Sequence, residues 1–167
     1  MNIVLTGMMG AGKTVVGKLL AEKLKMNFFD MDEKIEETTG MKISRIFKEK
    51  GEAAFRKIEA NLVDCISFLD NMVISTGGGV VLNKKNLDNF RKKGKIIYLK
   101  AKPEVLYERV KNKKGRPLLT AVSDPLAEMR KIYGVRKKYY ADCDYTVFTA
   151  HLTPFDIAEK IISLIKK

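Results

Sequence analysis

The most restrictive feature of this sequence is the segment 7–14, which reads Gly-Met-Met-Gly-Ala-Gly-Lys-Thr. It matches the phosphate-binding loop pattern G-x-x-x-x-G-K-[ST], and it lies between the apolar run 3–5 and a helical pattern. A glycine-rich turn is the alternative, but the lysine and threonine at the required spacing favour phosphate binding. Because such a loop joins a strand to the helix that follows it, the segment predicts an α/β fold that binds a nucleoside triphosphate.

Each residue type in the loop has a chemical role in binding a nucleoside triphosphate. The glycines let the backbone approach the phosphates, and the N-terminus of the next helix presents N–H groups to the anion. The lysine is expected to reach the β- and γ-phosphates, and the threonine hydroxyl to bind Mg²⁺. The expected nucleotide-binding residues of this segment are Gly10, Ala11, Gly12, Lys13, Thr14 and Val15.

The composition indicates one domain. The chain has 167 residues, of which 46% are hydrophobic, enough for one core with little room for a second domain. There is no apolar stretch of about 18 residues, and the first apolar run already serves as a strand, so we expect neither a membrane span nor a signal peptide. Cys65 and Cys143 lack a zinc or redox spacing. We expect a single domain over 1–167, located in the cytoplasm, with no membrane partner.

The formal net charge of +12 raises the question of nucleic-acid binding. The basic residues occur in short, scattered groups without interleaved aromatic residues, which is typical of solvated helix faces. A positive field also favours small anionic ligands. We therefore expect no nucleic-acid partner.

Apolar patterns of two kinds alternate along the chain. Short runs predict strands at 2–6, 27–30, 72–76, 95–99 and 145–149. Helical spacing predicts a helix that begins at about residue 13 and helices over most of 33–69, with breaks at Gly40 and Gly51. It also predicts a helix that begins at Pro103, one that ends at about Tyr140, and one that begins at Pro154. This alternation predicts a three-layer α/β/α fold with a central parallel five-stranded sheet, whose ligands lie at the C-terminal ends of the strands.

Two of those strand ends carry unusual residues. The second strand ends in Asp30-Met31-Asp32, and the third runs into three glycines at 77–79. We expect the two carboxylates to serve different partners, with Asp30 at Mg²⁺ and Asp32 facing an acceptor hydroxyl. Asp32 also fits as the N-cap of the next helix. The glycines fit either a flexible turn or a close backbone approach to a ligand.

Further motifs follow in order. They are Phe29-Asp30-Met31-Asp32, Ile46-Phe47, Gly51-Glu52, Phe55-Arg56-Lys57-Ile58-Glu59, Ser75-Thr76-Gly77-Gly78-Gly79, Arg116-Pro117-Leu118-Leu119, and Arg136 with Tyr140. With these motifs the sequence resembles, over nearly its whole length, the shikimate kinase family, a member of the nucleoside-monophosphate-kinase-like branch of P-loop proteins. The resemblance implies a P-loop kinase domain with a helical substrate-binding segment at about 31–60 and a lid at about 111–124.

The resemblance also implies where shikimate binds. The residues at matching positions are Asp32, Arg56, Gly78, Gly79 and Arg136, with Phe47 and Phe55 lining the ring pocket. Guanidinium groups suit the carboxylate of shikimate, and an acidic group suits its hydroxyls. Glu59 lies three residues after Arg56 and can hold its guanidinium, although such pairs are also common on helix surfaces.

Other implied residues surround the nucleotide. Arg116, in the lid, brings a cation to the charge that develops during transfer. Arg109 and the loop around Pro154 match positions near adenine, although Arg109 also fits as an exposed helix residue. No separate Walker B aspartate follows the third strand, where Ser75 takes that position. The resemblance assigns no role to Tyr139 or Tyr140, and His151 fits an exposed loop residue without chemistry.

The implied reaction is transfer of the ATP γ-phosphoryl group to the 3-hydroxyl of shikimate, in the pathway to aromatic amino acids. Lys13, Asp32 and Arg116 are the implied catalytic residues, and Mg²⁺, bound at Thr14 and Asp30, is the implied cofactor. We expect a monomer. Two other functions stay open: another small-molecule kinase of this fold, such as a gluconate kinase, and a nucleotide-dependent regulatory or nucleic-acid-binding module.

Overall fold

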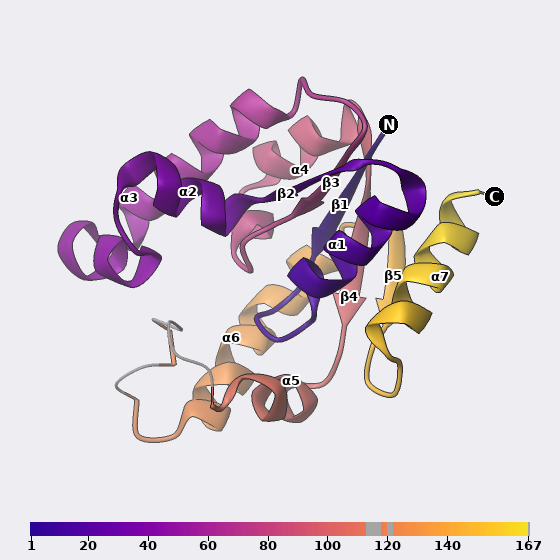
Figure 1. Ribbon diagram of the computed structural model, residues 1–167. Helices are drawn as coiled ribbons and strands as arrows, with labels where there is room; N and C mark the ends of the chain where they lie inside the picture. The colour runs from indigo at the N-terminus through magenta and orange to yellow at the C-terminus, as the bar shows by residue number, and fades with distance from the viewer. Residues whose placement is uncertain (113–117, 120–121, 167) are drawn as a thin grey trace.

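The computed structural model describes residues 1–112, 118–119 and 122–166. In this part of the chain, five parallel strands form one sheet in the order β2-β3-β1-β4-β5 (Figure 1). The strands are β1 (Asn2–Thr6), β2 (Asn27–Asp30), β3 (Met72–Ser75), β4 (Gly94–Lys100) and β5 (Tyr145–Phe148). The predicted parallel sheet is confirmed, with strand ends that differ by one residue. Because β1 is the central strand, the loop that follows it lies in the middle of the C-terminal edge of the sheet.

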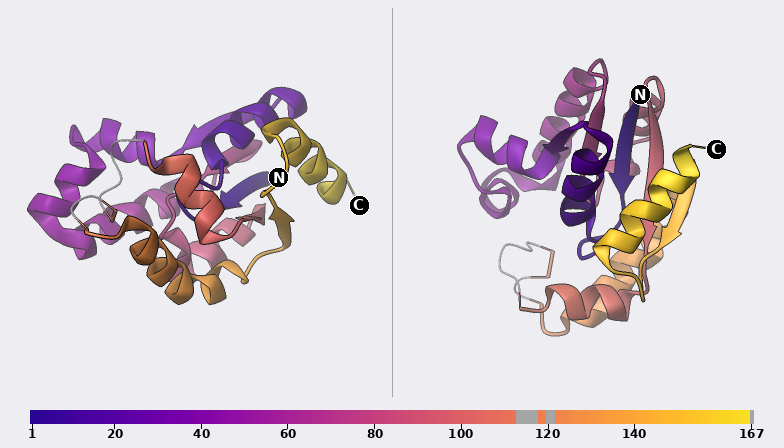
Figure 2. Two further views of the ribbon diagram at one scale, coloured as in Figure 1. Left: turned by 90° about the horizontal axis from the view of Figure 1, so that it is seen from below. Right: turned by 45° about the vertical axis from the view of Figure 1, so that its right-hand side comes forward.

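Helices cover both faces of the sheet, which confirms the three-layer fold. Helices α1 (Lys13–Leu24) and α7 (Pro154–Ile165) pack against each other on one face, and α4 (Lys84–Arg91) packs on β4 on the other (Figure 2). The remaining helices are α2 (Met31–Thr39), α3 (Ile43–Ile66), the 3₁₀ turn η1 (Val80–Leu82), α5 (Pro103–Val110) and α6 (Pro125–Tyr140). Among the described residues, no helix is both long and apolar enough to span a membrane.

The helical segment that leaves the sheet has a small core of its own. Ile35 of α2 packs with Ile46 and Phe55 of α3, apart from the main core around the sheet. Phe47 packs on this cluster, with its ring centroid 4.8 Å from that of Phe55. Inside α3 the chain kinks at Gly51, where φ is 80° and ψ is 168°. The kink confirms the predicted break and divides α3 into two helical parts.

The sequence did not predict α4 and η1. Helix α4 has only two large apolar residues, Leu87 and Phe90, and both are buried. Its two asparagines are weak helix formers, yet Asn86 donates to the carbonyl of Val80 and Asn89 donates to the carboxylate of Asp64. Contacts with distant parts of the chain therefore stabilise this helix more than its local pattern does.

Candidate functional site

The phosphate loop joins β1 to α1 in a conformation that requires glycine. Gly10 has a φ of 81°, and a Cβ at this position would lie 2.7 Å from the carbonyl oxygen of Leu106. Gly12 is the N-cap of α1, and no side chain of the described residues caps this helix. The first N–H groups of α1 are thus left to an anion at the positive end of the helix.

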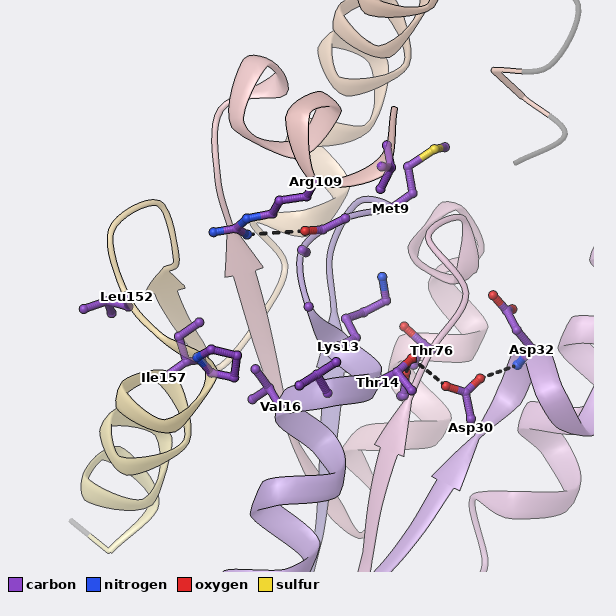
Figure 3. A pocket seen from close by; sticks show the side chains of 17 residues that line it. Met9, Lys13, Thr14, Val16, Asp30, Asp32, Thr76, Arg109, Leu152 and Ile157 are labelled. Carbon is purple, nitrogen blue, oxygen red and sulfur yellow. Dashed lines mark hydrogen bonds between the residues drawn. The ribbon is translucent and has the colours of Figure 1, made fainter. Parts of the chain in front are cut away.

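Oxygen-bearing side chains from three elements meet beside the loop. The Thr14 hydroxyl, in the first turn of α1, donates to Oδ2 of Asp30 at 2.8 Å (Figure 3). It also lies 3.4 Å from the Ser75 hydroxyl at the end of β3. Lys13 extends over the loop and donates to the carbonyls of Gly7 and Met8 at 2.8 and 3.1 Å. The predicted metal residues are therefore adjacent, and Ser75 stands beside them.

Asp30, and not Asp32, is the N-cap of α2. Oδ1 of Asp30 accepts hydrogen bonds from the backbone N–H groups of Asp32 and Glu33, at 3.0 and 3.3 Å. The alternative that Asp32 caps the helix is therefore wrong, because the helix begins at Met31 and places Asp32 in its first turn. As a result Asp32 keeps its carboxylate for other contacts, and Asp30 uses one oxygen for the helix and the other for Thr14.

A pocket of about 400 Å³ opens above the phosphate loop (Figure 3). The predicted nucleotide-binding residues that the structure describes all line it: Gly10, Ala11, Gly12, Lys13, Thr14, Val15, Arg109 and Pro154. Arg116 lies outside the described residues. Within the described residues, no three or more of the His, Cys, Asp and Glu side chains cluster as a metal site. This pocket is called the nucleotide pocket below.

Arg109 closes one side of the nucleotide pocket. It donates from Nη1 to the carbonyl of Gly10 at 3.3 Å and to the Thr149 hydroxyl at 3.2 Å, and from Nη2 to the Thr149 carbonyl at 2.6 Å. The alternative that Arg109 is an exposed helix residue is therefore wrong, because its guanidinium joins the phosphate loop to the end of β5. His151 is exposed in the turn before α7, as expected.

A second pocket, of about 650 Å³, lies between the helical segment, the glycine turn and α6. We call it the acceptor pocket. The residues predicted to bind the second substrate all line it: Asp32, Phe47, Phe55, Arg56, Gly78, Gly79 and Arg136. Leu118, from the predicted lid range, also lines it. Asp32 and Met9 line both pockets, so Asp32 lies on the wall that they share.

Arg56 is held on two sides by carboxylates of α3. It donates from Nη1 to Glu59 at 2.8 Å and from Nη2 to Glu52 at 3.1 Å. Because the Glu59 side chain is only 1% exposed, the pair of Arg56 with Glu59 is no ordinary surface pair.

The pKa values of this pair shift with burial. Burial raises the pKa of Glu59, and the nearby Asp32 adds to that rise, although Arg56 opposes it. Burial lowers the pKa of Arg56, but Glu59 and Glu52 outweigh it and keep the guanidinium charged. The role of Glu52, four residues before Arg56, was not predicted from the sequence, although helical spacing places the two side chains on one face.

The glycine turn after β3 allows close approach. A Cβ on Gly79 would lie 2.2 to 2.3 Å from the guanidinium atoms of Arg56, so the planar group packs directly on the Gly79 backbone. The carbonyl of Gly78 accepts hydrogen bonds from Arg136, at 3.2 Å, and from the Tyr140 hydroxyl. Gly79 therefore serves close packing with an arginine side chain, and the close approach of these glycines to a ligand stays a prediction.

The fold and the nucleotide pocket define a P-loop kinase. One pocket presents backbone N–H groups and a lysine to phosphates, and the other presents two guanidinium groups and an acidic group across a shared wall. The family model described as "Shikimate kinase" matches residues 9–166. The chain belongs to the shikimate kinase family.

Individual relatives agree with this assignment. The chain is 47% identical to a shikimate kinase of Caldanaerobacter subterraneus subsp. tengcongensis, over 96% of this chain and 94% of the relative. It is 37% identical to a solved structure of shikimate kinase from Acinetobacter baumannii in complex with shikimate, with a TM-score of 0.95 over 99% of this chain and 92% of that one. A gluconokinase from Sinorhizobium meliloti shares the fold, at 17% identity and a TM-score of 0.64.

Proposed function

We propose that this protein transfers the γ-phosphoryl group of ATP to the 3-hydroxyl of shikimate, giving ADP and shikimate 3-phosphate on the pathway to chorismate and the aromatic amino acids. The observation that carries the proposal is the position of Asp32 on the wall between the two pockets. An acceptor hydroxyl on that carboxylate faces the phosphates, while the carboxylate of the acceptor reaches Arg56 and Arg136. The relative solved with shikimate supports this choice of acceptor.

In this mechanism the protein mainly positions groups and neutralises charge. Lys13 and the N–H groups of α1 bind the phosphates, and Arg116 adds a cation as the lid closes. Asp32 orients the acceptor hydroxyl and accepts its proton late, because the transition state of phosphoryl transfer is loose. Gly78 and Gly79 present backbone groups to the acceptor ring, and Phe47 and Phe55 cover its apolar face.

The residues beside Thr14 fit Mg²⁺. Thr14, Asp30 and Ser75 supply hard oxygen donors, and Mg²⁺ in such sites takes few protein ligands because phosphates and waters supply the rest. We propose that Thr14 binds the ion directly and that Asp30 and Ser75 act through its waters. When bound, Mg²⁺ neutralises charge on the β- and γ-phosphates.

Further parts of the proposal concern the whole protein. We infer that the chain acts as one kinase domain over 1–167 and as a monomer. The cytoplasmic location stays a prediction from the sequence, as does the absence of a nucleic-acid partner.

The acceptor is tested by ADP release with shikimate, gluconate, nucleoside monophosphates, a polynucleotide or no acceptor. Release that depends on shikimate alone supports the proposal. Faster release with gluconate would favour the alternative sugar-acid kinase, whose similarity to this chain extends to the fold only. Release that depends on the polynucleotide would favour the nucleic-acid module.

Replacing Asp30 by asparagine should raise the Mg²⁺ concentration for half-maximal activity by about 10- to 100-fold, as loss of an outer-sphere carboxylate does. Asparagine still caps α2, so the helix is preserved. Asp32→Asn should instead lower kcat with the Mg²⁺ requirement and the ATP affinity little changed. Steady-state kinetics over a range of Mg²⁺ concentrations measures both. If both variants shift only the Mg²⁺ requirement, Asp32 is not at the acceptor.

Replacing Gly79 by alanine should raise the KM for shikimate by about 10- to 100-fold, because a charge-assisted contact is lost. The new Cβ would overlap the Arg56 guanidinium and displace it from the pocket. The KM for ATP should stay within about twofold, since nothing in the nucleotide pocket changes. Gly134→Ala is the matched control, because a Cβ there meets no atom within 4 Å. An unchanged KM for shikimate in Gly79→Ala would mean that Arg56 does not bind the acceptor from this position.

A further inference from the structure

The Gly78 carbonyl is held from α6 by two side chains. Arg136 donates to it from Nη1 at 3.2 Å, and the Tyr140 hydroxyl, one helical turn further on, donates to the same oxygen. The proposed function gives Arg136 a task at the substrate carboxylate and gives Tyr140 none. Tyr140 lies 62 residues from Gly78 in the sequence, so the contact joins two distant parts of the acceptor pocket.

The surroundings of Tyr140 fix the direction of its hydroxyl. The side chain is 1% exposed, and its ring stacks on that of Tyr98 with centroids 5.0 Å apart and planes 10° from parallel. Burial, followed by the nearby Tyr133, raises the pKa of Tyr98, and no hydrogen bond joins Tyr98 to the glycine turn among the described residues. Burial raises the pKa of Tyr140 to about 12, so its hydroxyl keeps its proton and donates throughout the neutral range.

Holding the Gly78 carbonyl also holds the N–H of Gly79. The two groups belong to one planar peptide unit and point in opposite directions, so a donor on the oxygen sets where the N–H points. Within the described residues, neither Gly78 nor Gly79 donates its N–H to another group of the protein. Both glycines line the acceptor pocket and have no side chain to anchor them. The N–H groups of Val80 and Leu82 hold the carbonyls of Gly77 and Gly79, at 3.3 and 3.0 Å, and the bonds from α6 hold the Gly78 carbonyl between them.

We propose that Tyr140 is a positioning residue for the acceptor. By holding the Gly78 carbonyl together with Arg136, it fixes the peptide that presents the Gly79 N–H to shikimate. Tyr140 does not line the acceptor pocket, and its effect passes through Gly78. The inference rests on the proposed function, because it concerns the same pocket and the same acceptor.

Kinetics of Tyr140→Phe tests the inference. The variant keeps the stacked ring and removes the hydroxyl, so the KM for shikimate should rise by about 3- to 10-fold, as loss of one neutral hydrogen bond predicts. The KM for ATP should stay within about twofold. Tyr98→Phe is the matched control, because it also removes a buried hydroxyl from the same ring stack. It should lower the melting temperature by a similar amount and leave the KM for shikimate unchanged.

A second measurement needs no turnover. In the protein without substrate, ¹⁵N relaxation should show more motion at the Gly78 and Gly79 amides in Tyr140→Phe, and no change in Tyr98→Phe. Equal KM values for shikimate in the two variants, or unchanged glycine relaxation in Tyr140→Phe, would overturn the inference. A wild-type protein that does not phosphorylate shikimate would instead refute the proposed function, and the relaxation data would still decide whether Tyr140 orders the turn.

Discussion

Lys13→Ala is expected to lower kcat by about 10²- to 10³-fold or more while leaving the protein folded, because it removes a cation from the transferring phosphoryl group. The Lys13 ammonium lies over the phosphate loop on the carbonyls of Gly7 and Met8 and lines the nucleotide pocket, outside the apolar core. The loss should therefore appear in the rate of transfer and not in the cooperativity of unfolding. Steady-state kinetics with shikimate, together with thermal unfolding, measures both quantities.

Two further variants make this test specific. Lys13→Met keeps the aliphatic stem of the side chain, so its activity should be as low as that of Lys13→Ala if the charge is what matters. Lys18→Ala removes an exposed lysine of the same helix, outside the nucleotide pocket, and should keep near-normal kcat. Near-normal turnover in a folded Lys13→Ala protein would contradict the assignment of the nucleotide site.

Arg56→Lys and Arg136→Lys should each lower kcat/KM for shikimate by about 30- to 1000-fold, which corresponds to about 2 to 4 kcal/mol for a charged partner left without its bidentate donor. Lysine keeps the charge but cannot form the planar fork that a carboxylate accepts. Because the carboxylate of shikimate does not react, most of the loss should appear in KM.

The carboxamide analogue of shikimate separates recognition of the carboxylate from general damage. Wild type should prefer shikimate strongly over the carboxamide, whereas both arginine variants should lose most of that preference. Arg45→Lys is the matched control, because Arg45 lies in the same helix and forms an exposed pair with Glu49 at 2.6 Å. If all four proteins discriminate equally, the carboxylate is recognised elsewhere or is not the group recognised.

Most of the fold was predictable from local patterns in the sequence. The phosphate loop fixed the first strand and helix, and short apolar runs located the other strands to within one residue. Helix α4 was not predicted because half of its buried residues are asparagines, Asn86 and Asn89, which are stabilised by hydrogen bonds to Val80 and Asp64. Such bonds depend on segments that meet only after folding, so no window of the sequence contains them.

The candidate site was predictable where a contact is local. The spacing of Arg56 and Glu59 places them on one helix face, and the structure joins them at 2.8 Å. The D-x-D pattern offered Asp32 as the N-cap of α2, whereas the backbone is still extended at Asp30 and helical from Met31, so Asp30 is the cap. The bonds of Tyr140 to Gly78 and of Arg109 to Thr149 span 62 and 40 residues, and neither follows from the helical pattern around them.

The three hydrogen bonds of Arg109 limit how it can meet a nucleotide base. All the N–H groups of a guanidinium lie in its plane, and Arg109 already directs that edge to Gly10 and Thr149. These bonds use three of its five N–H groups and hold the guanidinium in place, and its flat face attracts any aromatic ring by stacking. Stacking does not distinguish one purine from another, because every base has such a face. Stacking on Arg109 would therefore add affinity for any base, and selection of adenine over guanine requires hydrogen bonds to the edge of the base.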